Sequence, residues 1–179
     1  AAPSERCVGR TGPLRLLVVG GSLGAQALND IVPRALALIP AENRPVVTHQ
    51  SGATQIDTLR ANYQAAGVQA ELTPFIDDTA SAFAAADIIV CRAGASTVTE
   101  IAAVGAAAIF VPFPFAVDDH QTTNARFLVS AGGGWLVQQS DLTPEGLAKM
   151  LLNSERTALV DIAEKAKNMQ KINATREVV

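Results

Sequence analysis

The fold of this chain is decided by one stretch, Asp87-Ile-Ile-Val-Cys-Arg-Ala-Gly-Ala-Ser-Thr-Val-Thr-Glu-Ile-Ala-Ala-Val-Gly105. The three aliphatic residues after Asp87 form a short apolar run, which is typical of a strand buried on both faces. The small residues 93–95 allow a tight turn, and from Ser96 apolar side chains recur at spacings of three and four, which predicts a helix. A strand, a tight turn and a helix in this order predict uncapped amides at the helix start, and such amides suit a phosphate.

Glu100 lies about one turn into the predicted helix, on the same side as Ser96 and Thr97. Its carboxylate could accept both hydroxyls of a ribose while the helix start holds a phosphate, so the stretch has the shape of a nucleotide site. The same residues also match a capping box, in which Thr97 caps the helix and Glu100 bonds back to the Thr97 amide. The stretch alone leaves nucleotide binding and helix capping open.

Apolar and amphipathic segments predict that strand and helix alternate along the whole chain, without hairpin signals or internal repeats. This pattern is typical of an α/β fold with a doubly wound, mostly parallel Rossmann-like sheet of about six strands. Pro33 falls inside the first long helical segment, so we expect that helix to kink or restart near residues 29–30. Strands are expected at 14–19, 45–49, 69–73, 88–90, 107–111 and 132–137.

Two further corners follow strand ends, the glycine-rich Gly20–Gly24 and the polar Asp118–Asn124. The glycine corner lacks the Gly-Lys-Ser/Thr of a P-loop and the glycine spacing of a dinucleotide fingerprint. The second strand ends at His49 and Gln50 instead of an acid for a ribose, which argues against NAD. We expect one ligand to lie across the three corners, because open α/β sheets bind ligands at strand carboxyl ends. The alternative for the glycines is close strand–helix packing, and His49 is interpreted as a packed residue.

The composition excludes several classes of partner. The 179 residues suffice for one domain with its own core, and their net charge is −3 with 4% aromatic residues. A polybasic nucleic-acid surface and a base-stacking platform are therefore not expected, and no apolar run approaches membrane-spanning length. Cys7 and Cys91 lie far apart and favour a reducing, cytosolic compartment. Asp77 and Asp78 precede a helix and are interpreted as caps, so no metal is expected.

Residues 1–12 are polar and irregular, and we interpret them as a linker or the end of a preceding domain, with residues 13–179 as the folded domain. Because the chain opens Ala-Ala-Pro without a methionine, we expect it to be a piece of a longer protein.

Five spaced motifs occur in one order, and through them nearly the whole chain resembles the C-terminal half of the bacterial MurG family. Members of that family are two-domain GT-B glycosyltransferases whose C-terminal domain binds UDP-N-acetylglucosamine. They transfer N-acetylglucosamine to lipid I and so form lipid II in peptidoglycan synthesis, which supports cell wall growth, cell shape and cell division. The motifs are Gly20-Gly-Ser-Leu-Gly-Ala25, His49-Gln-Ser-Gly52, Phe75-Ile-Asp-Asp78, Arg92-Ala-Gly-Ala-Ser-Thr-Val-Thr-Glu100, and Asp118-Asp-His-Gln121 with Asn124.

The resemblance implies a donor-binding role for each motif. The first corner would lie near the diphosphate and the sugar, the backbone of Ile76 would read the uracil edge, and Glu100 would bind the ribose hydroxyls. The chain departs from the family pattern at Phe115, where many members carry His, and at His120, where some carry Gln. The remaining residues carried over are Gly21, Ser22 and Gly24 of the first corner, Ala95, Ser96 and Thr97 at the phosphate-binding helix start, and His120 and Gln121 as contacts of the N-acetylglucosamine.

The resemblance also implies parts that lie outside this chain. The N-terminal half of the family supplies the lipid I groove, the general base and the peripheral contact with the cytoplasmic face of the bacterial inner membrane. Transfer would invert the anomeric carbon without a metal or another cofactor. We expect this chain alone to be soluble, to bind the sugar nucleotide weakly and to transfer nothing.

Two other function classes stay open at this point. One is a non-catalytic, sugar-nucleotide-binding subunit of a two-chain N-acetylglucosaminyltransferase, like the dolichol-linked enzyme of eukaryotes. The other is an NAD-linked enzyme or an epimerase on a similar sheet.

Overall fold

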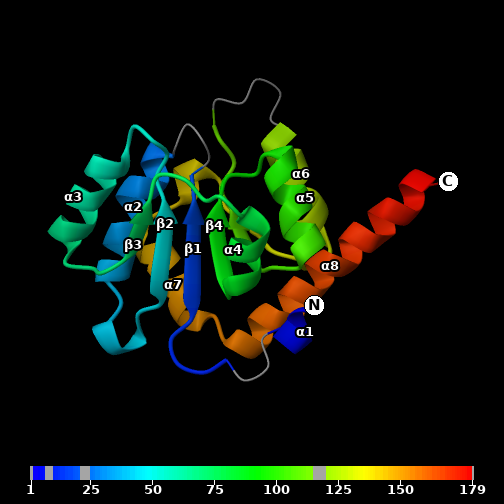
Figure 1. Cartoon of the computed structure of the whole chain (residues 1–179), viewed down its shortest axis with the longest axis horizontal. Helices are drawn as coiled ribbons and strands as arrows, with labels where there is room; N and C mark the ends of the chain where they lie inside the picture. The colour runs from blue at the N-terminus through cyan, green and yellow to red at the C-terminus, as the bar shows by residue number, and fades with distance from the viewer. Residues whose placement is uncertain (1, 7–9, 21–24, 115–119, 179) are drawn as a thin grey trace.

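The centre of the protein is a sheet of six parallel strands in the order β3-β2-β1-β4-β5-β6 (Figure 1). The computed structural model describes residues 2–6, 10–20, 25–114 and 120–178, without the side chains of residues 5, 6, 120 and 170–178. All six predicted strands are present, and the predicted fold class is confirmed. The strands are β1 Arg15–Val19, β2 Val46–Gln50, β3 Glu71–Thr73, β4 Ile88–Cys91, β5 Ala108–Phe110 and β6 Trp135–Leu136.

Helices pack on both faces of this sheet, as a doubly wound fold requires. α2, α3 and α7 supply one hydrophobic core, and α4, α5 and α6 supply the other. α8 contributes to both cores, and its C-terminal end extends away from the body of the domain (Figure 1). The helices are α1 Pro3–Arg6, α2 Gln26–Ala37, α3 Ile56–Ala66, α4 Thr79–Ala85, α5 Ala95–Val104, α6 His120–Ser130, α7 Pro144–Asn153 and α8 Arg156–Val178, with short 3-10 helices at Ala41–Asn43 and Gln139–Asp141.

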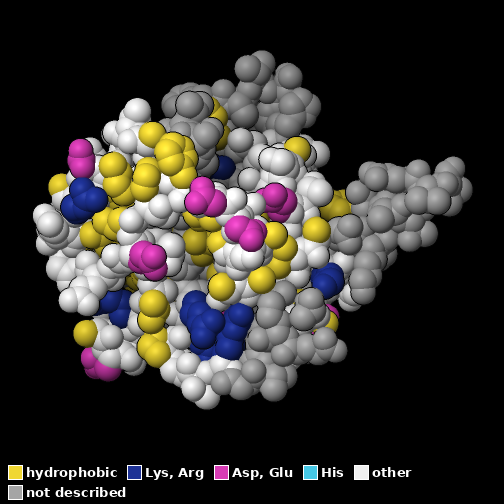
Figure 2. Space-filling model, viewed as in Figure 1, with side chains coloured by type: hydrophobic (Ala, Val, Ile, Leu, Met, Phe, Trp, Pro, Cys, Tyr) yellow, Lys and Arg dark blue, Asp and Glu magenta, His cyan; other side chains and the backbone are white. Residues whose placement is uncertain are grey.

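Two groups of like charge stand out on the face shown in Figure 2, among other charges of both signs. Basic side chains gather near the start of β1, whereas acidic side chains lie over the start of α4, nearer the carboxyl ends of the strands. The acids in this part of the chain are Asp77, Asp78 and Glu100, and all three are exposed.

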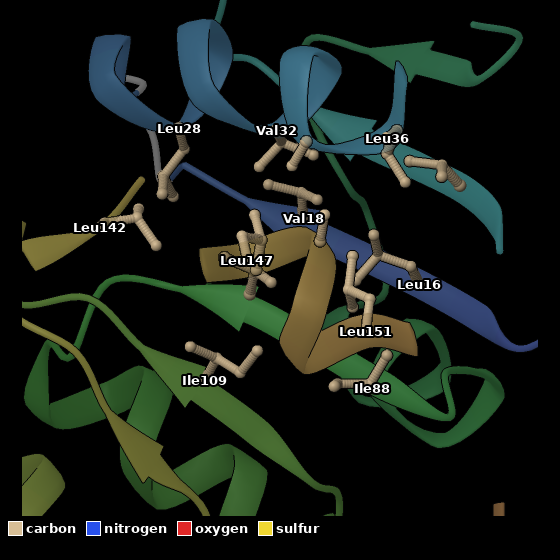
Figure 3. Close-up of a cluster of buried hydrophobic side chains, with 14 of the residues drawn as sticks. Leu16, Val18, Leu28, Val32, Leu36, Ile88, Ile109, Leu142, Leu147 and Leu151 are labelled. Carbon is tan, nitrogen blue, oxygen red and sulfur yellow. The ribbon is translucent and has the colours of Figure 1, made fainter. Parts of the chain in front are cut away.

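Side chains alternate between the two cores along each central strand. In β1, Leu16 and Val18 point to the core of α2 and α7, as Figure 3 shows, while Leu17 points to the opposite core. All four residues of β4 are buried, as expected for a strand covered on both faces. Burial of each large aliphatic side chain stabilises the fold by about 1.5–3 kcal/mol. The buried strands thus fix the positions at which the loops at the carboxyl edge of the sheet begin.

Pro33 lies within α2, but the helix runs without a break from Gln26 to Ala37. The prediction of a restart near residues 29–30 is therefore wrong. A proline has no N–H, so the carbonyl four residues earlier, that of Asn29, loses its helical partner. Nδ2 of Asn62 in α3 donates a hydrogen bond to that carbonyl at 3.0 Å. The neighbouring helix replaces the missing bond, and the sequence of α2 alone could not show this.

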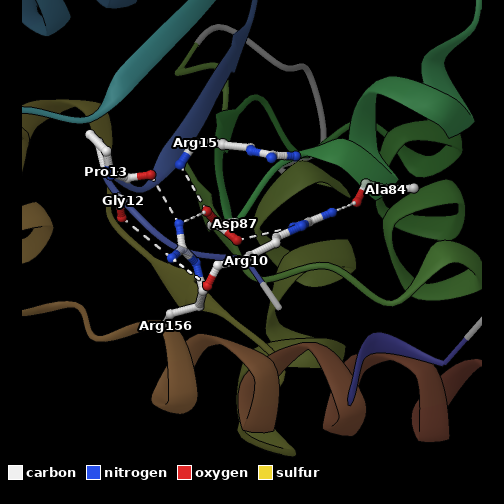
Figure 4. Close-up of polar contacts among 7 residues, drawn as sticks. All are labelled: Arg10, Gly12, Pro13, Arg15, Ala84, Asp87 and Arg156. Carbon is white, nitrogen blue, oxygen red and sulfur yellow. Dashed lines mark hydrogen bonds and ion pairs between the residues drawn. The ribbon is translucent and has the colours of Figure 1, made fainter. Parts of the chain in front are cut away.

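An ion-pair cluster around Asp87 joins distant segments at the amino edge of the sheet (Figure 4). The Asp87 side chain is 1% exposed and pairs with Arg10 at 3.0 Å and with Arg156 at 2.9 Å. The backbone amide of Arg15 donates to the same carboxylate at 2.8 Å. Burial alone would raise the pKa of Asp87, but hydrogen bonds from Arg156, Arg15 and Arg10 outweigh it and hold the pKa below its usual value.

The segment interpreted as a linker packs on the domain at two places. α1 lies beside α8 (Figure 1), where the amide of Ser4 donates to Oε1 of Glu164 at 2.9 Å. Arg10 enters the Asp87 cluster and also donates to the carbonyl of Ala84 at 2.8 Å. That this segment joins a preceding domain stays a prediction.

Candidate functional site

The carboxyl ends of β1 and β4 form the point at which the strand order reverses. Val19 of β1 pairs with Cys91 of β4, so the corners that follow these two strands begin side by side. Open α/β sheets bind their ligands in the crevice at such a switch point. The topology therefore places two of the three predicted corners where a ligand is expected.

The start of α5 presents backbone amides at this point. Gly94 is the N-cap, and its carbonyl accepts the first helical hydrogen bond from Val98 at 3.0 Å. The helix begins at Ala95, one residue earlier than predicted. Within the described part of the chain, nothing bonds to the amides of Ala95, Ser96 and Thr97. These N–H groups and the helix dipole favour an anion.

The capping alternative for Glu100 is wrong. Thr97 is the third residue of α5, so it cannot be the N-cap. Oε2 of Glu100 instead accepts a hydrogen bond from the hydroxyl of Thr79, the first residue of α4, at 3.0 Å. Oε1 of Glu100 makes no bond to any described residue. The carboxylate is exposed on the helix face that also carries Ser96 and Thr97, and it can accept hydroxyls from a ligand.

The turn after β3 carries Ile76 and is held by its neighbours. The Thr73 hydroxyl donates to the carbonyl of Phe75 at 2.6 Å, and Nε2 of Gln50 donates to the carbonyl of Pro74 at 2.8 Å. The Ile76 side chain packs against the core of α5, and its backbone groups bond to none of the described residues. That these groups read the uracil edge stays a prediction.

Gln121 and Asn124 join the first turns of α6 to the corner between β4 and α5. Oε1 of Gln121 accepts hydrogen bonds from the amides of Phe113 at 2.7 Å and Ala93 at 3.4 Å. Nδ2 of Asn124 donates to the carbonyl of Ala93 at 3.3 Å. The structure thus brings Gln121 to the α5 corner. Its Nε2 group has no partner among the described residues and can donate to a sugar hydroxyl.

Other predicted site residues lie outside the described residues. These are Gly21, Ser22 and Gly24 of the first corner, and residues 115–119 of the third. His120 begins α6, but its side chain is not among those described. Their predicted contacts with the diphosphate and the sugar stay predictions.

Arg92 is the first residue after β4, and no individual role was predicted for it from the sequence. Its Nη1 donates to the carbonyls of Val111 and Pro112 at 3.3 and 3.4 Å, and its guanidinium lies 5.5 Å from the centre of the Phe113 ring. Partial burial lowers its pKa, but an arginine keeps its charge at neutral pH. The sequence feature that could have pointed to Arg92 is its position, two residues before Gly94, the N-cap of α5.

His49 is packed, as interpreted from the sequence. Its Nδ1 lies 2.7 Å from the Tyr63 hydroxyl and its Nε2 lies 3.0 Å from Oδ1 of Asn29. Nδ2 of Asn29 donates a hydrogen bond to Oε1 of Gln55, so Oδ1 of Asn29 is the acceptor of a hydrogen bond from the protonated Nε2 of His49. The Tyr63 hydroxyl accordingly donates to Nδ1. Burial lowers the pKa of His49 to about 3, so the ring stays neutral at physiological pH and cannot serve as a base for a ligand.

The end of β2 does not resemble the strand end at which a dinucleotide enzyme binds a ribose. The Gln50 side chain is buried, and its Oε1 accepts the Gly20 amide at 3.0 Å while its Nε2 donates to Pro74. Both ends of this amide are therefore engaged within the protein. The position at which a dinucleotide enzyme carries its ribose acid instead links the first corner to the turn after β3.

An apolar groove of about 310 Å³ lies between α5 and α6. Phe127, which is exposed, forms part of its wall together with Val98 and Leu128. Ala95 of the predicted phosphate site and Asn124 of the third predicted corner are among the residues that line it. The groove and the predicted site therefore meet at the start of α5.

Two negative findings apply to the described ranges alone. No three or more His, Cys, Asp or Glu side chains gather there in a way that could hold a metal ion. No helix there combines the length and the apolar character that crossing a membrane requires. Asp78, one of the two adjacent acids, is the N-cap of α4 and accepts the Ser81 amide at 3.0 Å.

The family of the chain follows from comparison with known proteins. The family model described as the glycosyltransferase family 28 C-terminal domain matches residues 15–178. The chain belongs to this family. The six parallel strands and the switch-point corners described above are thus those of a glycosyltransferase family 28 domain.

Relatives within the family are similar over nearly the whole chain. A protein of Paracidovorax citrulli (strain AAC00-1) is 79% identical over 178 residues, covering 99% of this chain and 50% of the relative. A protein of Acidovorax sp. (strain JS42) is 71% identical over 177 residues, covering 99% of this chain and 44% of the relative. Both are named UDP-N-acetylglucosamine--N-acetylmuramyl-(pentapeptide) pyrophosphoryl-undecaprenol N-acetylglucosamine transferase.

The chain is also similar to a solved structure. The crystal structure of Acinetobacter baumannii MurG is 40% identical to this chain, with a TM-score of 0.86, and the match covers 100% of this chain and 54% of that one. The chain therefore spans about half the length of the relatives that it matches.

Proposed function

We propose that this chain is the donor-binding part of an inverting N-acetylglucosaminyltransferase that converts lipid I to lipid II in peptidoglycan synthesis. The names of the relatives supply the donor, UDP-N-acetylglucosamine, and the acceptor. The observation that carries the proposal is the meeting of free amides at the start of α5 with the exposed carboxylate of Glu100, at the switch point of the sheet. A helix start binds phosphate, and a carboxylate one turn later accepts ribose hydroxyls.

In this proposal the chain orients the donor and stabilises the leaving group. The C4 hydroxyl of the acceptor sugar attacks the anomeric carbon from the face opposite UDP, and the bond from that carbon to the diphosphate breaks. Negative charge then grows on the diphosphate. The amides of residues 95–97 and the Arg92 guanidinium are fixed groups that favour this charge without reorganising. The general base, the lipid I groove and the contact with the cytoplasmic face of the inner membrane belong to the half that this chain lacks.

The other donor contacts are proposed from the motifs. The free backbone groups of Ile76 read the uracil edge, and Nε2 of Gln121, with His120, binds the N-acetylglucosamine. The glycine corner of Gly21, Ser22 and Gly24 comes after β1 in the sequence, and the end of β1 pairs with the end of β4, which supports its proposed contact with the diphosphate and the sugar.

The two rival functions are less well supported. An NAD-linked enzyme needs a free acceptor at the end of β2, where the Gln50 amide is engaged at both ends. A separate binding subunit is less well supported because the relatives reported above, at 79% and 71% identity, are named as transferases.

Calorimetric titration with UDP-N-acetylglucosamine, UDP and NAD tests the proposal. We expect both uridine ligands to bind and NAD not to bind. Glu100→Gln should weaken UDP binding roughly tenfold, since it removes the charge from a hydrogen-bonded acceptor. The matched control is Glu145→Gln, which removes the same charge from an exposed position on α7, and it should leave the affinity unchanged. A wild-type chain that ignores UDP, or a Glu100→Gln variant that binds it normally, would disprove the assignment.

A further inference from the structure

On the basis of this proposed function, we propose that Thr79 is a positioning residue for ribose recognition. Its hydroxyl holds the Glu100 carboxylate in one orientation and ties it to the turn that carries Ile76. The expected ligand chemistry is a pyrimidine ribonucleotide whose ribose hydroxyls are both free.

The Thr79 hydroxyl is itself held in place. It belongs to the first residue of α4, and that helix is capped by Asp78, whose Oδ1 accepts the Ser81 amide at 3.0 Å and whose Oδ2 accepts the Ser81 hydroxyl at 2.7 Å. From this fixed helix start, Oγ1 of Thr79 donates to Oε2 of Glu100 at 3.0 Å. The bond joins residues that are 21 positions apart in the chain.

The bond limits the freedom of Glu100 without using up its capacity. An unrestrained glutamate on a helix surface samples many rotamers, and a ligand that needs one of them must bear the entropy loss. A carboxylate accepts about four hydrogen bonds, of which Thr79 uses one. Oε1 therefore remains open to a ribose diol while Oε2 sets the direction of the group.

The same turn sets both the base-reading and the ribose-reading groups. Ile76 lies three residues before Thr79, in the turn that joins β3 to α4. This turn is fixed by the hydrogen bonds from Thr73 to Phe75 and from Gln50 to Pro74. A displacement of this turn would move the Ile76 backbone and the Glu100 carboxylate together. Uracil and ribose are accordingly read as one unit.

The charge around Thr79 favours hydroxyl donors over phosphate. Acidic side chains lie over the start of α4 (Figure 2), and the exposed acids here are Asp77, Asp78 and Glu100. Their negative potential repels a phosphate, which is instead favoured at the amides of residues 95–97. The charges thus favour the ribose of a nucleoside diphosphate beside Glu100 and its phosphates at the start of α5.

The test is calorimetry on this chain with UDP, 2′-deoxy-UDP and 3′-deoxy-UDP. We expect the wild type to bind UDP roughly tenfold more tightly than either deoxy analogue, as for hydrogen bonds to a charged group. Thr79→Val should reduce that ratio to roughly threefold by weakening UDP and leaving the analogues nearly unchanged. Thr79→Ser keeps the hydroxyl and should restore the wild-type ratio. In a Glu100→Ala background, which lacks an acceptor for the Thr79 hydroxyl, Thr79→Val should have no further effect.

Thr99→Val is the matched control, because the Thr99 hydroxyl is bonded to the carbonyl of Ala95 within α5 at 2.8 Å. It should leave the ratio at the wild-type value, and melting temperatures should be equal among the variants. If Thr79→Val keeps the wild-type ratio, or binds UDP more tightly because the hydroxyl competes with the ribose, the inference is overturned while the proposed function stands. If the wild type does not bind UDP at all, both are overturned.

Discussion

Lowering the pH should destabilise this domain through His49. The ring is fully buried and bonded at both nitrogens, and burial lowers its pKa from 6.5 to about 3. In the unfolded chain the same imidazole is exposed and keeps its ordinary pKa of about 6.5. Below that pH the unfolded state therefore binds a proton that the folded state excludes.

The magnitude follows from this difference in pKa. The stability that His49 contributes is fully present above about pH 6.5 and declines as the pH falls toward the folded pKa, by about 1.4 kcal/mol per pH unit. At pH 5 the loss is about 2 kcal/mol, a large share of the 5–15 kcal/mol that is typical of a domain. Asp87 also has a lowered pKa, but its contribution to stability is lost only as the pH falls below the ordinary aspartate pKa of 3.8, outside this window.

Urea unfolding at pH 7, 6 and 5 measures the effect, with His49→Gln as the comparison because glutamine does not titrate. The difference in unfolding free energy between wild type and variant should shrink by about 2 kcal/mol from pH 7 to pH 5. A difference that stays constant over this range would refute the conclusion that the ring is kept neutral by burial.

Three substitutions test other parts of the packing by urea unfolding at pH 7. Asp87→Asn leaves the guanidinium groups of Arg10 and Arg156 without a counter-charge, and should lower the unfolding free energy by about 3 kcal/mol. A loss below about 1 kcal/mol would mean that solvent screens these ion pairs. Asn62→Ala leaves the carbonyl of Asn29 without its replacement donor and should cost about 1 kcal/mol, and an unchanged midpoint would contradict this role. Gly105→Ala adds a Cβ that would lie 2.9 Å from Cγ of Pro3, at a residue whose φ is +77°. Gly67→Ala is the control, because Gly67 has a φ of +69° but no atom of a described residue near the added Cβ, so it should lose only the about 1–2 kcal/mol of left-handed backbone strain. The unfolding free energy should fall more in Gly105→Ala than in Gly67→Ala, and equal losses would contradict the contact with α1.

The parts of the site that follow from neighbouring residues could be predicted from the sequence. The apolar run, the small residues and the helix pattern between Asp87 and Gly105 lie in one continuous stretch, and the structure has β4, the Gly94 cap and α5 there. The αL cap at Gly67 and the Asp78 cap of α4 are equally local signals, and both are present.

The parts that depend on distant residues could not be predicted in this way. The bond between Thr79 and Glu100 joins two helices, and it shows that the Glu100 carboxylate is directed to α4, while the Gly94 N-cap excludes the capping box. The unbroken α2 depends on Asn62 of the next helix, whose side chain replaces the bond that Pro33 removes. The place of the Arg92 guanidinium depends on the fold as well, since its contacts are with Phe113 and the carbonyls of Val111 and Pro112 after β5.

The central claim is that the amides of α5 and the Glu100 carboxylate together hold a uridine diphosphate sugar. A crystal structure of this chain soaked with UDP-N-acetylglucosamine tests it most directly. We predict diphosphate oxygens on the amides of residues 95–97 and both ribose hydroxyls on Glu100. Density for the donor at another edge of the sheet, or a Glu100 side chain turned away from the ribose, would contradict the claim.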